Sequence, residues 1–356
     1  MIFTAAASLY SILALFWIPA ESTAVRMVER GGWSCNVEST LEESSVVSVA
    51  RVTWLMGTEM RAVVCADSRA DGVAALEDAF AEIRQVESRL STWIDDSELS
   101  RLNSAPPGNW VELSASTMDL LEEVRDWTLR TGGAFDPAVG VLIDAWDMRG
   151  TGREPAAEEL VQALESTGFR YLEIDATRSR VRRLRAVRID AGAFGKGAGL
   201  RAAAEALLAS RARSAVLEFG GQIEIVSSAL NGARWTIEVA DPVHRDRTVT
   251  RLRIGRASVA TTGSSERFIE VDGHQLGHVI DPRNGHPIPA WGSVTVVAED
   301  PVTADILSTA LFVMGPEAAI DWSQDLDIGV LLLIDSGSGI TMFRNDALIR
   351  METDNS

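Results

Sequence analysis

Hydrophobic positions recur along this chain with two different periods, and each period predicts a different kind of element. A spacing of three to four residues predicts helices over residues 72–90, 117–131, 155–166, 195–209 and 302–315. Short runs rich in β-branched residues predict strands over 46–55, 60–65, 171–174, 187–189, 215–219, 222–226, 235–239, 248–254, 268–271, 274–280, 294–298 and 329–334. Asp272-Gly273 suits the turn of a hairpin. Helices and strands are interleaved without a regular βαβ alternation, which favours an α+β fold with mixed or antiparallel sheets and packed helices.

Composition excludes several functional classes. The 356 residues are 46% hydrophobic and 24% charged, as in a globular protein. The net charge of −18 argues against nucleic-acid binding through phosphate contacts, which needs Lys and Arg. The two cysteines, Cys35 and Cys65, have no zinc-type spacing. A Cys35–Cys65 bridge is possible in an oxidising compartment, but nothing in the spacing requires it, so we do not predict it.

The N-terminus has the character of a targeting segment. Residues 2–18 carry no charge, and Ser22-Thr23-Ala24 offers a cleavage site with small residues. We therefore expect a signal peptide or membrane anchor over 1–24, a linker over 25–47 and one domain over 48–350. This predicts a location on the extracytoplasmic side of the inner or plasma membrane. No Lys or Arg precedes the apolar run, so a buried N-terminal helix and a cytoplasmic location stay open.

The helix over residues 302–315 carries two oxygen-bearing side chains on one face. Asp300 or Thr303 suits its N-cap, Pro301 its first turn and Gly315-Pro316 its end. Asp305 and Thr309 are four residues apart, so their side chains lie one turn apart on the same face. A carboxylate and a hydroxyl suit a hard cation such as Mg²⁺. On spacing alone the simpler interpretation is favoured, in which Asp305 complements the helix N-terminus and Thr309 is half-buried.

The segment Asp190–Gly199 combines a carboxylate, four glycines and Lys196 just where a helix is expected to begin. Backbone N–H groups and an ammonium at such a place can bind a phosphate. The segment matches neither the Walker motif nor the dinucleotide fingerprint. As an isolated feature it more often reflects close packing of a helix on a sheet.

Histidines and one aspartate provide the remaining candidates. All four histidines lie between residues 244 and 286, and His274 and His278 share parity on a predicted strand. Too few further ligands accompany them for zinc. A general base, a polar lining residue or an ordinary surface residue are all consistent with His278. Asp136 taken alone is a turn aspartate, and no GxSxG motif supports an activated serine.

Taken together, the segments resemble one known family. The chain from about Met56 to Leu348 resembles the FAD:protein FMN transferases, also called ApbE-like flavin transferases. The segments that carry this resemblance, in chain order, are Met56-Gly-Thr58, Leu90–Asn103, Phe135–Trp146, Asp190–Gly199, Glu218-Phe-Gly-Gly221, Val259-Ala-Thr-Thr-Gly263, Gly277–Pro287, Ser293–Val297 and the Asp305 helix. The order of these segments is more specific than any one of them.

The resemblance implies an activity and a set of site residues. Such enzymes use Mg²⁺ to cleave FAD and join FMN to a Thr or Ser of an acceptor flavoprotein, releasing AMP. By this resemblance Asp305, Thr309 and the backbone carbonyl of Ala193 bind the metal, and His278 takes the proton of the acceptor hydroxyl. The residues implied to line the FAD site are Met56, Trp93, Ala134, Phe135, Asp136, Asp190 and Lys196, with Val279 or Ile280 near the flavin. An FAD pyrophosphatase giving FMN and AMP, or a non-catalytic flavin-binding protein, are the alternatives.

The chain departs from the family pattern at four places. Asp190-Ala191-Gly192 stands where Asp-Leu-Ser is common, and Lys196-Gly197-Ala198 where Lys-Gly-Tyr is common. Ser264-Ser265-Glu266 replaces a usual Asp-Tyr-Arg, and Trp93 replaces a familiar tyrosine. These positions belong to the implied cofactor pocket, where substitutions can alter flavin affinity or acceptor choice.

Overall fold

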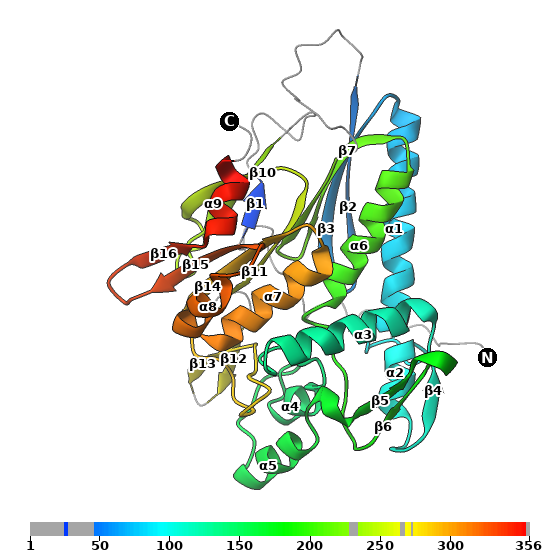
Figure 1. The fold of residues 1–356 in the computed structure, drawn as a ribbon, viewed down its shortest axis with the longest axis vertical. Coiled ribbons are helices and arrows are strands. Elements are labelled where there is room, and N and C mark those ends of the chain that lie inside the picture. Colours follow the sequence, from blue (N-terminus) through cyan, green and yellow to red (C-terminus); the bar gives the residue numbers. More distant parts are fainter. Residues whose placement is uncertain (1–24, 28–45, 228–233, 264–267, 272, 354–356) are drawn as a thin grey trace, which may run out of the picture.

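The computed structural model describes residues 25–27, 46–227, 234–263, 268–271 and 273–353, and its centre is one large antiparallel sheet (Figure 1). Eight strands follow the order β16-β15-β14-β11-β8-β7-β3-β2, and all neighbours are antiparallel. The strands are β2 (Val47–Leu55), β3 (Thr58–Ala66), β7 (Ala212–Phe219), β8 (Gln222–Ser227), β11 (Ala257–Gly263), β14 (Gly292–Ala298), β15 (Gly329–Asp335) and β16 (Ile340–Arg344). The expected α+β class with antiparallel sheets is confirmed.

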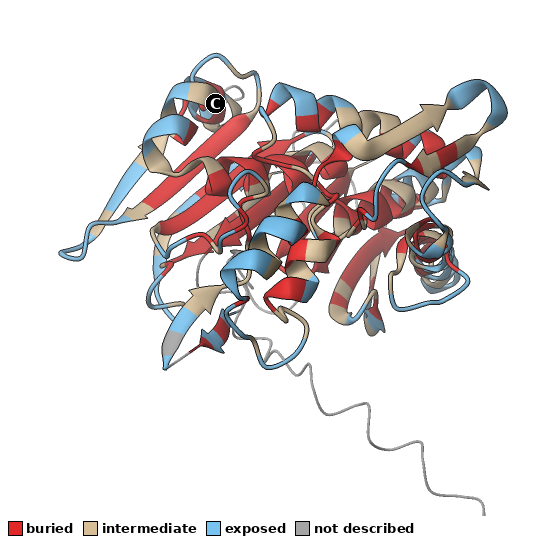
Figure 2. Cartoon of the chain, turned by 90° about the horizontal axis from the view of Figure 1, so that it is seen from below, coloured by how far each residue is buried: buried red, intermediate tan, exposed pale blue. Residues whose placement is uncertain are grey.

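Alternation of side chains along these strands gives the sheet two buried faces. One face packs against helices α1 (Arg69–Leu90), α6 (Gly195–Ala209) and α7 (Pro301–Met314), through residues such as Val64, Leu217 and Phe219. The other face packs against a small sheet and a terminal helix, through residues such as Val216 and Ile225. These outer elements are β1 (Val25–Met27), β9 (Trp235–Ala240), β10 (Thr248–Ile254) and α9 (Asp346–Thr353). The central strands are therefore buried along most of their length (Figure 2).

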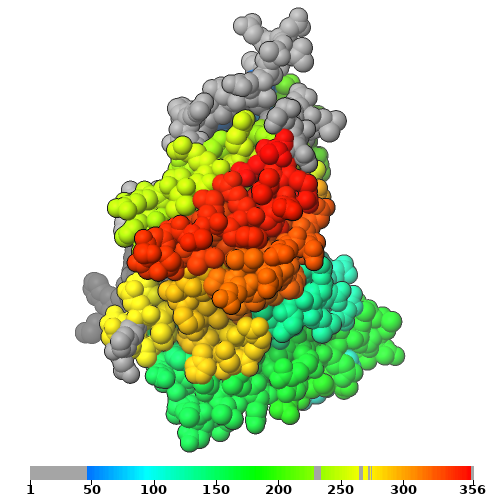
Figure 3. All heavy atoms as spheres, turned by 60° about the vertical axis from the view of Figure 1, so that its left-hand side comes forward, coloured from blue at the N-terminus to red at the C-terminus, as the bar shows by residue number. Residues whose placement is uncertain are grey.

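The chain between α1 and α6 forms a second region, which we call the lower region, below the sheet in Figure 1. It contains α2 (Glu98–Ser104), α3 (Ala115–Arg130), α4 (Gly140–Ala145), α5 (Ala157–Glu165) and the small sheet of β4 (Trp110–Glu112), β6 (Arg180–Arg183) and β5 (Leu172–Asp175). The hairpin of β12 (Phe268–Val271) and β13 (His274–Gly277) contributes to the same core cluster as α4. One core cluster runs from Leu99 and Phe135 of this region to Leu307 and Phe312 of α7. Figure 3 shows the same division on the surface, with the lower region in teal and green and the C-terminal elements in orange and red above it.

Most predicted elements are confirmed within a few residues, and one prediction is wrong. Val187–Ile189 is not a strand, although Val187 and Ile189 are buried. Side chains bond this backbone instead: Asn103 donates to the Ile189 carbonyl and accepts from its N–H, both at 2.8 Å, and Arg183 donates to the Val187 carbonyl. The strand forms earlier, at Arg180–Arg183, where arginine side chains lie over the Trp110 ring.

Two expectations about the N-terminal part also change. Within the expected linker, Val25–Met27 form β1 and pair with β9, so these three residues belong to the fold. Cys65, buried on β3, is disulfide-bonded, although spacing did not predict a bridge. Pairing depends on the distance between cysteines in the fold and not on their spacing. Cys35 and the expected targeting segment 1–24 lie outside the described residues, among which no helix has the length and apolarity to cross a membrane.

Candidate active site

The start of α7 is fixed by polar contacts that do not involve the Asp305 carboxylate. Asp300 is the N-cap, and its carboxylate accepts a hydrogen bond of 2.7 Å from the Thr303 N–H. The same carboxylate binds Arg201 of α6, which also forms two bonds of 2.8 Å with Glu123 of α3. Asp300, one of the two predicted candidates, therefore caps the helix. Asp305 lies one turn further on and is only 4% exposed.

Both oxygens of the buried Asp305 carboxylate have partners on α6. Lys196 Nζ lies 3.1 Å from Oδ1, and the Gly197 N–H donates to Oδ2 at 2.9 Å. The predicted metal-binding helix and the glycine segment, 109 residues apart in sequence, thus meet at one point. A buried carboxylate needs such positive partners, because its desolvation is otherwise costly.

Glycine makes this contact between helices possible. A Cβ at Gly197 would lie 2.5 Å from the Pro301 carbonyl oxygen and 2.7 Å from the Val302 Cα, both backbone atoms of α7. Any side chain at this position would force the two helices apart. The glycine segment therefore serves close packing, as its simpler interpretation holds, and the same close approach brings the Gly197 N–H to Asp305.

Three hydroxyl groups surround the Asp305 turn. Thr309 Oγ1 lies 3.4 Å from Thr262 Oγ1, and Thr262 also bonds to Ser308 at 2.8 Å. Thr309 and Ser308 both donate to the Asp305 carbonyl. No group of three or more His, Cys, Asp or Glu that fits a metal occurs within the described ranges. Any cation here would be held by one carboxylate, hydroxyls and backbone carbonyls, which is a set of hard oxygen ligands.

Met56 lies beside the start of α6. Its φ of 47° is unusual for a residue other than glycine, and its N–H donates to Glu87 at 2.9 Å. Its side chain covers Gly195 and Gly199, and a Cβ at either position would lie 3.3 or 3.4 Å from it. The structure thus brings Met56, Lys196, Asp305 and Thr309 close together, and these are residues that the family resemblance assigns to one site. Ala193 stands two residues before α6 begins.

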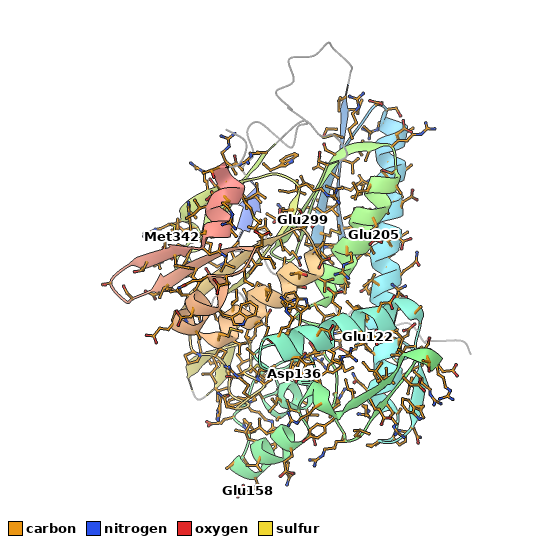
Figure 4. The ribbon with its side chains drawn as sticks, viewed as in Figure 1. Glu122, Asp136, Glu158, Glu205, Glu299 and Met342 are labelled. Carbon is orange, nitrogen blue, oxygen red and sulfur yellow. The ribbon has the colours of Figure 1, made fainter. Side chains whose placement is uncertain are left out.

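Ala134 and Phe135 are buried in the core, and the Asp136 carboxylate is bonded to backbone N–H groups. Ala134 and Phe135 are 1% and 2% exposed and belong to the main core, so the Phe135 ring is not available to a ligand. The Asp136 carboxylate accepts hydrogen bonds from the N–H groups of Ala138 and Phe169 at 2.9 Å. Burial raises the pKa of Asp136, and these two bonds lower it by a smaller amount. Figure 4 shows Asp136 in the lower region, beneath α3.

Trp93 and Asp190 are joined by a residue that the sequence did not indicate. Trp93, in the loop after α1, is 70% exposed. Asp190 forms an ion pair with Arg149, and the Arg149 guanidinium lies 5.4 Å from the centre of the Trp93 ring. Arg149 belongs to no motif, so sequence reasoning missed it. Thr262 was also missed, although it stands in the Val259–Gly263 segment that supports the family resemblance.

His278 and Ile280 lie in the segment that follows the β12–β13 hairpin. His278 directly follows β13 and is half-buried. Ile280 is buried in a small core with Leu142 and Trp146, whereas Val279 is partly exposed and packs against the main core. Arg283, further along this segment, donates to the Val313 carbonyl at the end of α7. The segment is thus attached to the helix that carries Asp305.

Comparisons with known proteins agree with this architecture. The model of a family described as the ApbE family matches residues 56–332. The FAD:protein FMN transferase of Haemophilus influenzae is 28% identical over 322 residues, which cover 87% of this chain and 92% of that protein. The FAD:protein FMN transferase of Treponema pallidum is 32% identical over 302 residues, covering 80% of this chain and 83% of that protein.

Solved structures show the same fold. The ApbE protein of Thermotoga maritima superposes with a TM-score of 0.78 at 29% identity, covering 86% of this chain and 99% of that one. The flavin transferase ApbE of Vibrio cholerae has a TM-score of 0.75 at 26% identity, with coverage of 86% and 99%. Since the family model spans most of the chain and the fold agrees, this chain belongs to the ApbE family, a family of FAD:protein FMN transferase enzymes.

Proposed function

We propose that this protein is a Mg²⁺-dependent flavin transferase that cleaves FAD and attaches FMN to a Thr or Ser hydroxyl of an acceptor flavoprotein, releasing AMP. The observation that carries the proposal is the buried Asp305 carboxylate, held by Lys196 and the first turn of α6 beside the Thr309 hydroxyl. Membership of the family supports the flavin chemistry.

The residues around Asp305 fit a magnesium ion. Asp305 and Thr309 side chains and the Ala193 carbonyl would hold it, all through hard oxygen atoms. The ion pair between the Lys196 ammonium and Asp305 Oδ1 supports this fit, because that oxygen already binds a cationic group. When bound, the ion would supply positive charge to the pyrophosphate of FAD.

Lys196 and the start of α6 would bind the same pyrophosphate. The N–H groups of a helix N-terminus and an ammonium both favour an anion. The Lys196 side chain is 28% exposed, so its ammonium can reach a ligand while its stem packs beside Gly220. Close packing of Gly197 on α7 holds this turn in place and lowers the reorganisation needed during the reaction.

His278 would act on the acceptor hydroxyl, which is a weak nucleophile without a base. The acceptor oxygen forms a bond to the phosphorus of the FMN half while the bond from that phosphorus to the bridging oxygen breaks. AMP takes the bridging oxygen as its own phosphate oxygen, and His278 takes the acceptor proton. With water in place of the acceptor, the same site would give the alternative, free FMN and AMP.

We also propose that the protein acts outside the cytoplasm. The uncharged residues 2–18 support export or anchoring, and the disulfide at Cys65 fits an oxidising compartment. β1, which directly follows the expected targeting segment, is paired with β9 and would hold the domain close to an anchor. Cell fractionation that recovers the intact chain only from the soluble cytoplasm would contradict this location.

The proposed activity is tested by incubating the protein with FAD, Mg²⁺ and candidate flavoprotein domains, followed by intact-mass measurement of the acceptor. The expected result is a gain equal to the mass of FMN less one water, with AMP released in equal amount. If FMN and AMP appear in solution and the acceptor gains no mass, the protein hydrolyses FAD and does not transfer FMN. If FAD stays bound and unchanged, the protein binds FAD and catalyses neither transfer nor hydrolysis.

A further inference from the structure

Arg149 connects its own loop to two loops whose residues the family resemblance implies to line the FAD site. It lies in the turn after α4, and its guanidinium forms the ion pair with Asp190, in the loop before α6. The same nitrogen, Nη2, donates to Thr92 Oγ1 at 3.3 Å, and the group lies over the neighbouring Trp93 ring. One cation therefore contacts two residues implied to line the FAD site, Trp93 and Asp190.

The backbone that carries Arg149 is held firmly. Asp147 adopts a φ of 50°, and its carboxylate accepts a bond of 3.1 Å from the Thr151 N–H. Buried Trp146 donates to the Gly285 carbonyl at 2.7 Å, and Gly152 packs against Ile269 of β12. Because the turn is fixed before any ligand binds, little entropy would be lost in placing the guanidinium.

The charge of Arg149 matters because of where Asp190 lies. The Asp190 carboxylate is partly exposed, accepts from the Gly192 N–H at 2.8 Å and stands six residues before Lys196, the proposed pyrophosphate ligand. An uncompensated carboxylate at this place would repel the pyrophosphate. Paired with Arg149, the same carboxylate is neutralised and fixed in direction.

We propose that Arg149 is a positioning residue that makes the site select phosphate-bearing flavins: it neutralises Asp190 and supports Trp93, so that FAD binds better than uncharged riboflavin. This inference rests on the proposed function, since it places Asp190 and Trp93 at the FAD site. It assigns a role to a residue outside every segment that carries the family resemblance.

The test compares binding of FAD and riboflavin by calorimetry in the full chain and in Arg149→Gln, and measures KM and kcat for FMN transfer. The free energy of a charge-assisted hydrogen bond corresponds to a fall in FAD affinity of roughly 10- to 100-fold in Arg149→Gln. Riboflavin affinity should change by less than about 3-fold, KM for FAD should rise, and kcat should hold at saturating FAD. The matched control is Arg153→Gln in the same loop, whose partner is the exposed Glu159; it should bind both flavins like the parent.

A second pair of variants separates charge from structure. Arg149→Gln/Asp190→Asn removes both charges and should recover a large part of the lost FAD affinity, and Arg149→Lys should keep the preference for FAD. Equal losses for FAD and riboflavin, or a double variant no better than Arg149→Gln, would overturn the inference. A parent chain that prefers FAD while Arg149→Gln keeps that preference overturns only the role of Arg149. A parent chain that binds no FAD overturns both this role and the proposed function.

Discussion

The two regions that meet at the site fix their functional residues in different ways. At the sheet, Asp305 and Lys196 stand on helices whose backbones touch, because Gly197 leaves no side chain between them. In the lower region the corresponding residues stand on loops, which side chains such as Arg149 and Asn103 tie together. Packed helices keep a fixed geometry, which suits stabilisation of the charge that develops during the reaction. Loops joined by side chains suit recognition of a ligand.

The largest expected effect concerns His278, at the boundary between the two regions. His278→Ala should slow FMN transfer roughly 10²- to 10⁴-fold, because the acceptor hydroxyl loses its base. FAD binding should stay unchanged, since the proposed pyrophosphate ligands are on α6. Single-turnover kinetics with a flavoprotein acceptor, together with calorimetry of FAD binding, provide the measurement.

His286→Ala is the matched control for that variant, because His286 is near by in the chain and packs against Trp146. If His278→Ala transfers FMN at the parent rate, His278 is not the base. Loss of FAD binding in the same variant would assign His278 to the binding site and not to proton transfer.

A substitution at the helix contact should affect stability and activity together. Gly197→Ala places a Cβ against the backbone of α7, so the helices must separate, with a loss of about 1–3 kcal/mol in the free energy of unfolding. Transfer should fall in parallel, because Asp305 loses its partner. Denaturant unfolding and transfer assays measure both, with Gly255→Ala as the control, since a Cβ at Gly255 meets no atom within 4 Å. Equal stability of Gly197→Ala and the control would show that the contact is not tight.

A buried acid near the same contact should make stability depend on pH. Burial raises the pKa of Glu224 to about 8, with a smaller contribution from the charge of Asp300, against the lowering effects of Ser258 and Arg256. Below its ordinary pKa of 4.5 the folded and unfolded chains are both protonated there. Between that value and about 8 only the folded chain keeps the proton, so stability is lost as pH rises, by up to about 1.4 kcal/mol per pH unit.

Glu224→Gln removes this titration and should gain stability over the parent as pH rises through that window. Thermal or denaturant unfolding at several pH values measures the difference in unfolding free energy between the variant and the parent. The other titrating groups are the same in both proteins, so their contributions cancel. Glu205→Gln, on the exposed side of α6, is the control and should follow the parent (Figure 4). A difference between Glu224→Gln and the parent that stays constant from pH 5 to 8 would contradict the account.

Sequence predicts the helix-borne half of the site better than the loop-borne half. The four-residue spacing of Asp305 and Thr309 follows from helical periodicity, and the helix is confirmed from Pro301 to Met314. The contact of Asp305 with Lys196 spans 109 residues, which no local pattern encodes; the family resemblance assigned both residues to the site but did not predict their ion pair. Arg149 is recognisable only once three loops are folded together.

Local patterns also misled where side chains replace backbone partners. Val187–Ile189 has the residue types of a strand, but Asn103 and Arg183 satisfy its backbone groups. Tertiary packing decided the outcome there, and a single sequence does not record it.

The most direct test of the proposed Mg²⁺ site is a magnesium titration of FMN transfer in the parent chain, Asp305→Asn and Asp321→Asn. Asp321 is an exposed residue of the neighbouring helix α8 (Pro316–Ser323) and leaves the site intact. The account predicts that the parent and Asp321→Asn saturate together, while Asp305→Asn loses transfer by at least about 10- to 100-fold or needs far more Mg²⁺. Equal magnesium dependence of all three proteins would contradict it.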